Sequence, residues 1–169
     1  MAHWLARLLK HRMLDESDAR RTLTKEALAR IEARVGASEK RHRGEIRVVV
    51  EAGLPLSYLR RKATPRDRAL AMFGKLGVWD TESNNGVLIY LLLAERAIEI
   101  VADRGLNRHV PAEEWTQIAT TMKNAFQSGD FEGGLLRAID AVDALLVRHF
   151  PRQVGDSDIN ELPDAPLVR

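Results

Sequence analysis

The most constraining feature of the sequence is a long, mostly apolar stretch over residues 87–102 that a charged pair at residues 95–96 divides into two segments. Residues 87–94 are apolar without a break, as in a strand buried on both faces. After the pair, Ile98 and Ile100 alternate with Glu99, which is typical of a strand nearer the edge of a sheet. We therefore predict a hairpin with its turn at residues 94–96. Because a hairpin returns to its starting edge, the residues before 87 should lie beside those after 102.

The flanking segments predict an α/β fold. Residues 45–51 have the pattern of a largely buried strand. Residues 64–67, Thr-Pro-Arg-Asp, are a strong helix start, because the threonine can cap and the proline suits the first helical position. Strand, helix and strand form a βαβ unit with parallel strands. With the hairpin it makes a small mixed sheet, and two amphipathic helices follow it, from residue 111 to residue 150.

Three regions are expected along the 169 residues. Residues 1–22 are predicted to be a basic amphipathic helix followed by a polar connector, and residues 23–151 to be the α/β domain. Residues 152–169 lack periodicity and are predicted to be a flexible polar tail. The apolar side chains of residues 1–14 fit either an anionic membrane surface, the domain itself, or a second copy of the chain.

Composition narrows the classes of function. The chain has no cysteine, which excludes disulfides and thiolate metal sites. Residues 1–68 carry a net charge of +8 and the remainder −6, so the first part could meet anionic partners. Nucleic acid is not an expected partner, because the basic clusters are not interleaved with stacking aromatics. No apolar run is long enough to span a bilayer. We expect a cytoplasmic protein, either free or peripheral on the inner membrane face.

Oxygen-bearing side chains gather at the two ends of the hairpin. Carboxylates and amides are ligands for Ca²⁺ or Mg²⁺. The candidate metal ligands are Asp80, Glu82, Asn84, Asn85 and Asp103. Their spacing does not match an EF-hand loop. The alternative is that residues 84–86, Asn-Asn-Gly, simply form a turn, since asparagine and glycine adopt positive φ at low cost.

Three further residues at the same edge are candidates for holding a ligand. The Arg104 guanidinium can bind a phosphate or carboxylate through two parallel hydrogen bonds. Alternatively, it can form an ion pair with a nearby acid and hold the loop in place. Asn107 follows it, and His109 is the histidine best placed for acid–base work. The sequence contains no P-loop, dinucleotide-binding or nucleophile-elbow motif.

The sequence resembles the TPM domain family, in its short, soluble bacterial type. The resemblance rests on several short segments that occur in order: Gly-Glu-Ile-Arg-Val-Val-Val at 44–50, Asn-Gly-Val-Leu-Ile-Tyr-Leu at 85–91, the charged turn, Ile-Glu-Ile-Val-Ala-Asp-Arg-Gly at 98–105, and His-Phe-Pro at 149–151. It implies a three-layer α/β/α sandwich. By position, the family residues Asn85, Gly86, Asp103, Arg104 and Gly105 carry over to this chain.

The resemblance also implies several functions. Some bacterial relatives bind divalent cations, many accompany LemA-type membrane proteins, and plant relatives linked to photosystem repair have been proposed to be acid phosphatases. We therefore expect a binding module for a divalent cation, a protein partner or both, associated with the maintenance of membrane proteins. The alternative is a metal-assisted phosphatase, in which a cation at the Asp80 and Asp103 edge activates water and Arg104 holds the phosphate.

Overall fold

The computed structural model describes residues 2–156 and 160–169, which form a four-stranded mixed sheet covered by helices. The strands are β1 (Ile46–Glu51), β2 (Val87–Leu92), β3 (Ala97–Ala102) and β4 (Leu167–Val168), in the order β3-β2-β1-β4. The β1 strand pairs in parallel with both β2 and β4, and β2 pairs antiparallel with β3. This arrangement confirms the predicted βαβ unit, the hairpin, and the position of its second strand at an edge.

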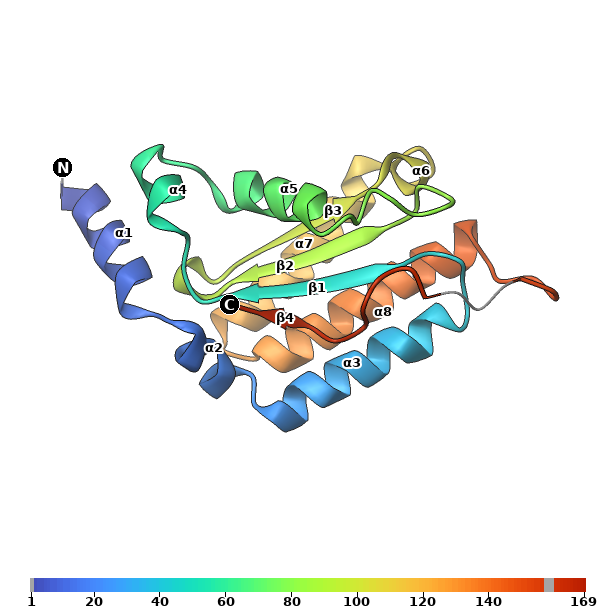
Figure 1. The fold of residues 1–169 in the computed structure, drawn as a ribbon, viewed down its shortest axis with the longest axis horizontal. Coiled ribbons are helices and arrows are strands. Elements are labelled where there is room, and N and C mark those ends of the chain that lie inside the picture. Colours follow the sequence, from blue (N-terminus) through green and yellow to red (C-terminus); the bar gives the residue numbers. More distant parts are fainter. Residues whose placement is uncertain (1, 157–159) are drawn as a thin grey trace.

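Helices cover both faces of the sheet, as the predicted sandwich requires (Figure 1). One face packs against α3 (Lys25–Glu39), α7 (Ala112–Gln127) and α8 (Phe131–His149). The other packs against α5 (Pro65–Lys75) and the short α4 (Leu56–Arg60). Successive residues of β1 and β2 point alternately into the two cores, and all are buried. The unbroken apolar character of β2 follows from this double burial, whereas β1 buries two charged residues, Arg47 and Glu51.

Local signals account for several element boundaries. At the start of α5, the Asp67 amide donates to the Thr64 hydroxyl at 3.1 Å, and the Thr64 amide donates to the Asp67 carboxylate at 2.7 Å. This is the predicted capping box, with Pro65 at the first helical position. The hairpin turn is a short 3-10 segment, η1 (Leu93–Glu95), which ends at Arg96 with a φ of +47°.

A short helix replaces the polar connector that we predicted. The predicted connector after the first helix, α1 (Ala2–Met13), is the helix α2 (Glu16–Thr22). A capping box between Asp15 and Asp18 begins α2, and the burial of Ala19 fixes it to the core. The hydrophobic pattern did not predict α2, because only one of its residues is apolar and buried. The chain leaving the hairpin also forms a helical turn, α6 (Arg104–Asn107).

The end of the chain corrects the prediction of a flexible tail. The Arg169 amide donates to the Val50 carbonyl at 2.9 Å, and the Ala52 amide donates to the Arg169 carbonyl at 2.8 Å. The Arg47 guanidinium further donates to the carbonyls of Pro163 and Ala165. The free edge of β1 supplies these partners, so a two-residue strand forms without any sequence periodicity of its own. Residues 157–159 of the predicted tail lie outside the described residues.

A buried charged network ties α5 to the centre of the sheet. The guanidinium of Arg68 makes a two-pronged hydrogen bond to the Glu51 carboxylate, with Nε at 2.8 Å from Oε2. The Tyr90 hydroxyl donates to the same Oε2 at 2.7 Å. All three side chains are buried. The burial and the adjacent carboxylate raise the pKa of Tyr90, so its hydroxyl stays a donor.

Glu51→Gln should lower the free energy of unfolding by about 3 kcal/mol, because it leaves the buried Arg68 without a counter-charge. Tyr90→Phe is the milder companion and should cost about 1 kcal/mol, since only one neutral donor is lost. Urea unfolding followed by circular dichroism measures both. Equal losses in the two variants would contradict the role given to the ion pair.

Candidate functional site

The two ends of the hairpin meet at one edge of the sheet, as predicted. The Asp103 amide donates to the Gly86 carbonyl at 2.9 Å, and the Gly105 amide donates to the Asn84 carbonyl at 2.9 Å. The contact is so close that a Cβ on Gly105 would lie 2.3 Å from the Asn84 oxygen and 2.7 Å from that of Ser83. Glycine is therefore required at position 105. The loop before β2 and α6 form a single interlocked unit.

The two asparagines of this loop have structural partners. Asn84 has a φ of +51°, and its side-chain oxygen accepts hydrogen bonds from Nε and Nη2 of Arg104 at 3.3 and 3.2 Å. Asn85 is buried, and its amide nitrogen donates to the Arg43 carbonyl at 2.9 Å. Its backbone and side chain also bond to the Thr81 hydroxyl. Much of the hydrogen-bonding capacity of both amides is thus used to hold the turn and the adjoining segments.

Asp103 differs from its neighbours because one oxygen of its carboxylate has no hydrogen-bond partner in the part of the chain that the structure describes. Its Oδ1 accepts from the Arg104 amide at 2.6 Å and caps α6. Its Oδ2 is buried and has no hydrogen-bond partner among the described residues. The residue is only 9% exposed. An unsatisfied carboxylate oxygen in such a place is costly, so it is the atom of this edge that most needs a ligand.

The remaining predicted residues form no hydrogen bond to Asp103 in the described part of the chain, and each lies in other surroundings. The Asp80 side chain is exposed. The Glu82 backbone amide donates to the Glu161 carboxylate at 3.1 Å. Asn107 donates to the Ala102 carbonyl at 2.7 Å. His109 stacks on His149, with ring centroids 5.3 Å apart.

In the described part of the chain, no three acidic or histidine side chains converge as a metal-binding group. A cation at this edge would therefore be held by Asp103, by carbonyl or amide oxygens, and by water.

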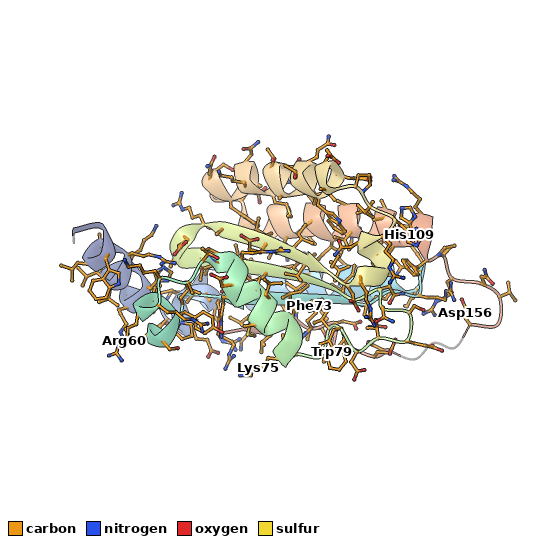
Figure 2. The ribbon with its side chains drawn as sticks, turned by 90° about the horizontal axis from the view of Figure 1, so that it is seen from above. Arg60, Phe73, Lys75, Trp79, His109 and Asp156 are labelled. Atoms are coloured by element: carbon orange, nitrogen blue, oxygen red, sulfur yellow. The ribbon has the colours of Figure 1, made fainter. Side chains whose placement is uncertain are left out.

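Figure 2 shows His109 near one end of the molecule and Arg60 near the other.

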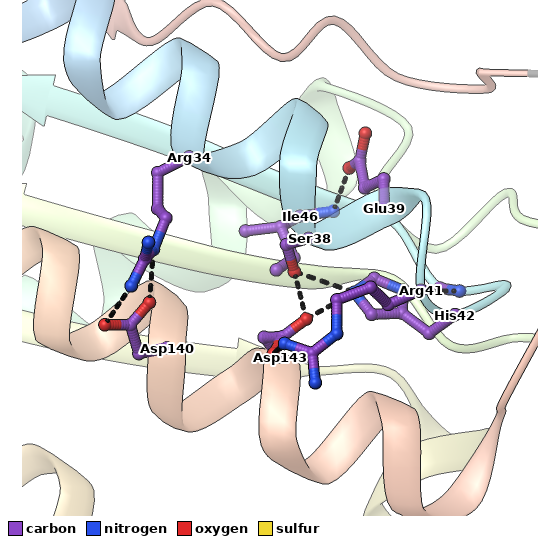
Figure 3. Close-up of polar contacts among 9 residues, drawn as sticks. Arg34, Ser38, Glu39, Arg41, His42, Ile46, Asp140 and Asp143 are labelled. Carbon is purple, nitrogen blue, oxygen red and sulfur yellow. Dashed lines mark hydrogen bonds and ion pairs between the residues drawn. The ribbon is translucent and has the colours of Figure 1, made fainter.

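Sequence reasoning missed a buried cluster of serine, histidine and aspartate between α3 and α8 (Figure 3). Nε2 of His42 lies 2.8 Å from the Ser38 hydroxyl, which donates to the Asp143 carboxylate at 2.9 Å. Nδ1 of His42 accepts from the Gly44 amide at 3.2 Å. Nδ1 is thus an acceptor, so neutral His42 carries its proton on Nε2 and donates it to Ser38. A nucleophilic serine would instead donate to the histidine, so this cluster is structural.

A second missed cluster brings carboxylates together beside the start of β1. Burial raises the pKa of Glu39 to about 9 and that of Glu45 to about 7, and the charge of the nearby Asp164 adds to both increases. Glu39 accepts from the Ile46 amide at 2.9 Å, and Glu45 accepts from the Leu162 amide at 3.2 Å. No local motif could signal this cluster, because Glu45 and Leu162 are 117 residues apart.

Comparison with known proteins places these features in context. A sequence model of the TPM domain matches residues 17–145. The NMR structure of the BA42 protein from the psychrophilic bacterium Bizionia argentinensis is 30% identical, with a TM-score of 0.74 over 86% of this chain and 94% of that one. The N-terminal domain of a protein from P. gingivalis has the same fold at 22% identity, with a TM-score of 0.61 over 82% and 97% of the two chains. No curated protein matches the chain.

The buried His42 should make stability depend on pH. Burial lowers its pKa from 6.5 to about 4, so between these values the unfolded chain binds a proton that the folded chain does not. Stability that His42 contributes above pH 6.5 is therefore lost as the pH falls towards 4, by at most about 3 kcal/mol. The raised pKa values of Glu39 and Glu45 act in the opposite direction.

The difference in unfolding free energy between the wild type and His42→Gln isolates the histidine from those acids. We expect wild-type stability relative to the variant to fall as the pH is lowered from 7 to 4.5 in denaturant titrations. A difference that is independent of pH would show that His42 is not held neutral.

Proposed function

Because the chain belongs to the TPM domain family, we propose that it is a ligand-binding module whose hairpin edge holds a divalent cation. The observation that supports this function is the buried Oδ2 of Asp103, which has no hydrogen-bond partner among the described residues. A cation would compensate the carboxylate charge and fill its open coordination position. This proposal agrees with the cation binding that the family resemblance implies.

The neighbouring groups suit a hard cation. The carbonyls of Ser83 and Asn84 lie against Gly105, two residues after Asp103. Calcium accepts mixed sets of carboxylate, carbonyl and water oxygens with flexible geometry, whereas magnesium demands near-ideal octahedra. Calcium is therefore the better fit. With one carboxylate in the set and the Arg104 guanidinium nearby, we expect weak binding, with a Kd on the order of 10⁻⁴ to 10⁻³ M.

Asp103→Asn should abolish calcium binding while it preserves the fold, because asparagine also caps a helix but carries no charge. Isothermal titration calorimetry with calcium and then magnesium measures the loss. Asp130→Asn is the matched control: Asp130 also caps a helix, α8, and it is exposed. Binding that persists in Asp103→Asn, or that disappears equally in both variants, would contradict the proposed site.

One observation favours a metal-assisted phosphatase as the second candidate function. The exposed Arg104 follows Asp103 directly, so a carboxylate that could bind a cation and a guanidinium that could bind an anion lie at the same edge. The cation would activate water, and Arg104 would hold the phosphate.

Under this second function, p-nitrophenyl phosphate should be hydrolysed in the presence of Mg²⁺ or Ca²⁺. Asp103→Asn should remove the activity, and Arg104→Lys should raise KM, because the forked contact is lost. Turnover that survives Asp103→Asn would come from a contaminant. An inactive wild type would rule out the phosphatase function, so that only the proposed cation binding remains.

A protein partner, including a membrane protein of LemA type, stays a prediction from the family resemblance. Within the described residues, no helix is long and apolar enough to cross a bilayer.

A further inference from the structure

The first helix is attached to the domain by one face only. His11 is 3% exposed, and its Nδ1 accepts from the Leu54 amide at 2.9 Å while its Nε2 contacts Glu95 at 2.8 Å. Arg7 donates to the Glu95 carboxylate at 2.8 Å and to the Ala63 carbonyl at 2.7 Å. These contacts are one turn apart on α1, so they fix the rotation of the helix about its axis.

The opposite face of α1 presents apolar side chains to solvent. Leu5, Leu9 and Met13 are spaced four residues apart, and they are 50%, 61% and 78% exposed. Five of the eight large apolar residues exposed in the described structure belong to α1 and α4, including Trp4 and Leu56. A concentration of this kind marks an interaction surface rather than scattered exposure.

Positive charge lies at the same end of the molecule as this apolar strip. Lys10 and Arg12 are exposed on α1, which has no acid in its sequence. The run 60–62, Arg-Arg-Lys, lies at the end of α4, and both helices occupy the same end of the molecule (Figures 1 and 2). Within the described residues none of these five cations forms an ion pair, and the Arg61 guanidinium lies over the Tyr58 ring, 3.9 Å from its centroid. We call the surface made by Leu5, Leu9, Met13 and these five cations the α1–α4 surface.

We infer that the α1–α4 surface docks on an anionic lipid bilayer. Leucine and methionine would enter the interface while lysine and arginine meet the headgroups, as in other interfacial helices. A second copy of the chain is a poorer occupant, because two α1–α4 surfaces would bring like charges together. The α1–α4 surface lies at the opposite end of the molecule from α6, so this inference is independent of the proposed cation site (Figure 1).

Co-sedimentation with vesicles tests the inference. The wild type should bind phosphatidylcholine vesicles that contain phosphatidylglycerol, should bind pure phosphatidylcholine much less, and should be released by high salt. Lys10→Glu/Arg12→Glu should weaken binding by roughly tenfold or more. Leu5→Ser/Leu9→Ser/Met13→Ser should also weaken it, and these exposed positions leave the core intact.

Lys75→Glu/Lys123→Glu is the matched charge control, because both lysines are exposed and lie outside α1 and α4. It should bind vesicles as the wild type does. The inference is overturned if the wild type does not sediment with anionic vesicles, or if the control loses binding as much as the α1 variants. It is also overturned if the serine variant abolishes a concentration-dependent dimer, seen by analytical ultracentrifugation, and leaves vesicle binding unchanged.

Discussion

The parallel pairing of β1 with β2 is the interaction on which the rest of the structure depends. The two strands are aligned from Ile46 opposite Val87 to Glu51 opposite Leu92, and every residue in both is buried. Strands of this kind must be covered on both faces, which is why α5 lies on one side and α3 and α8 on the other. The free edge of β2 takes β3, and the free edge of β1 takes β4. The candidate site follows from the same pairing, because β3 ends beside the start of β2.

Much of this fold was predictable because its signals are local. The apolar run at 87–94, the charged turn and the capping box at Thr64 each specify an element within a few residues. The features that escaped prediction lack such signals. In α2, Ala19 is the buried residue, and β4 is a two-residue strand that exists through hydrogen bonds offered by β1. Backbone pairing of this kind leaves no pattern in the side chains.

The candidate site was predictable in position but not in detail. Hairpin geometry placed Asn84, Asn85, Asp103 and Arg104 at one edge, and the structure has them there. The sequence could not show that Asn85 is hydrogen-bonded to Arg43 and Thr81, or that one Asp103 oxygen has no partner among residues 2–156 and 160–169. Nor could it reveal the Ser38–His42–Asp143 cluster, because Asp143 is 105 residues from Ser38 and meets it only when α3 packs on α8. Residues close together in the sequence specify the turns, whereas tertiary packing determines which polar atoms remain available to bind a ligand.

Under the two proposals, the molecule has two functional ends on either side of the sheet, with α6 and Asp103 at one and the α1–α4 surface at the other. We propose that a cation completes the environment of the buried Asp103 carboxylate. A crystal structure of the protein grown in calcium tests this claim most directly. We predict calcium density on Oδ2 of Asp103, with further oxygen ligands from the loop before β2. An Asp103 Oδ2 that instead accepts hydrogen bonds from protein or water, with no ion beside it, would contradict the claim.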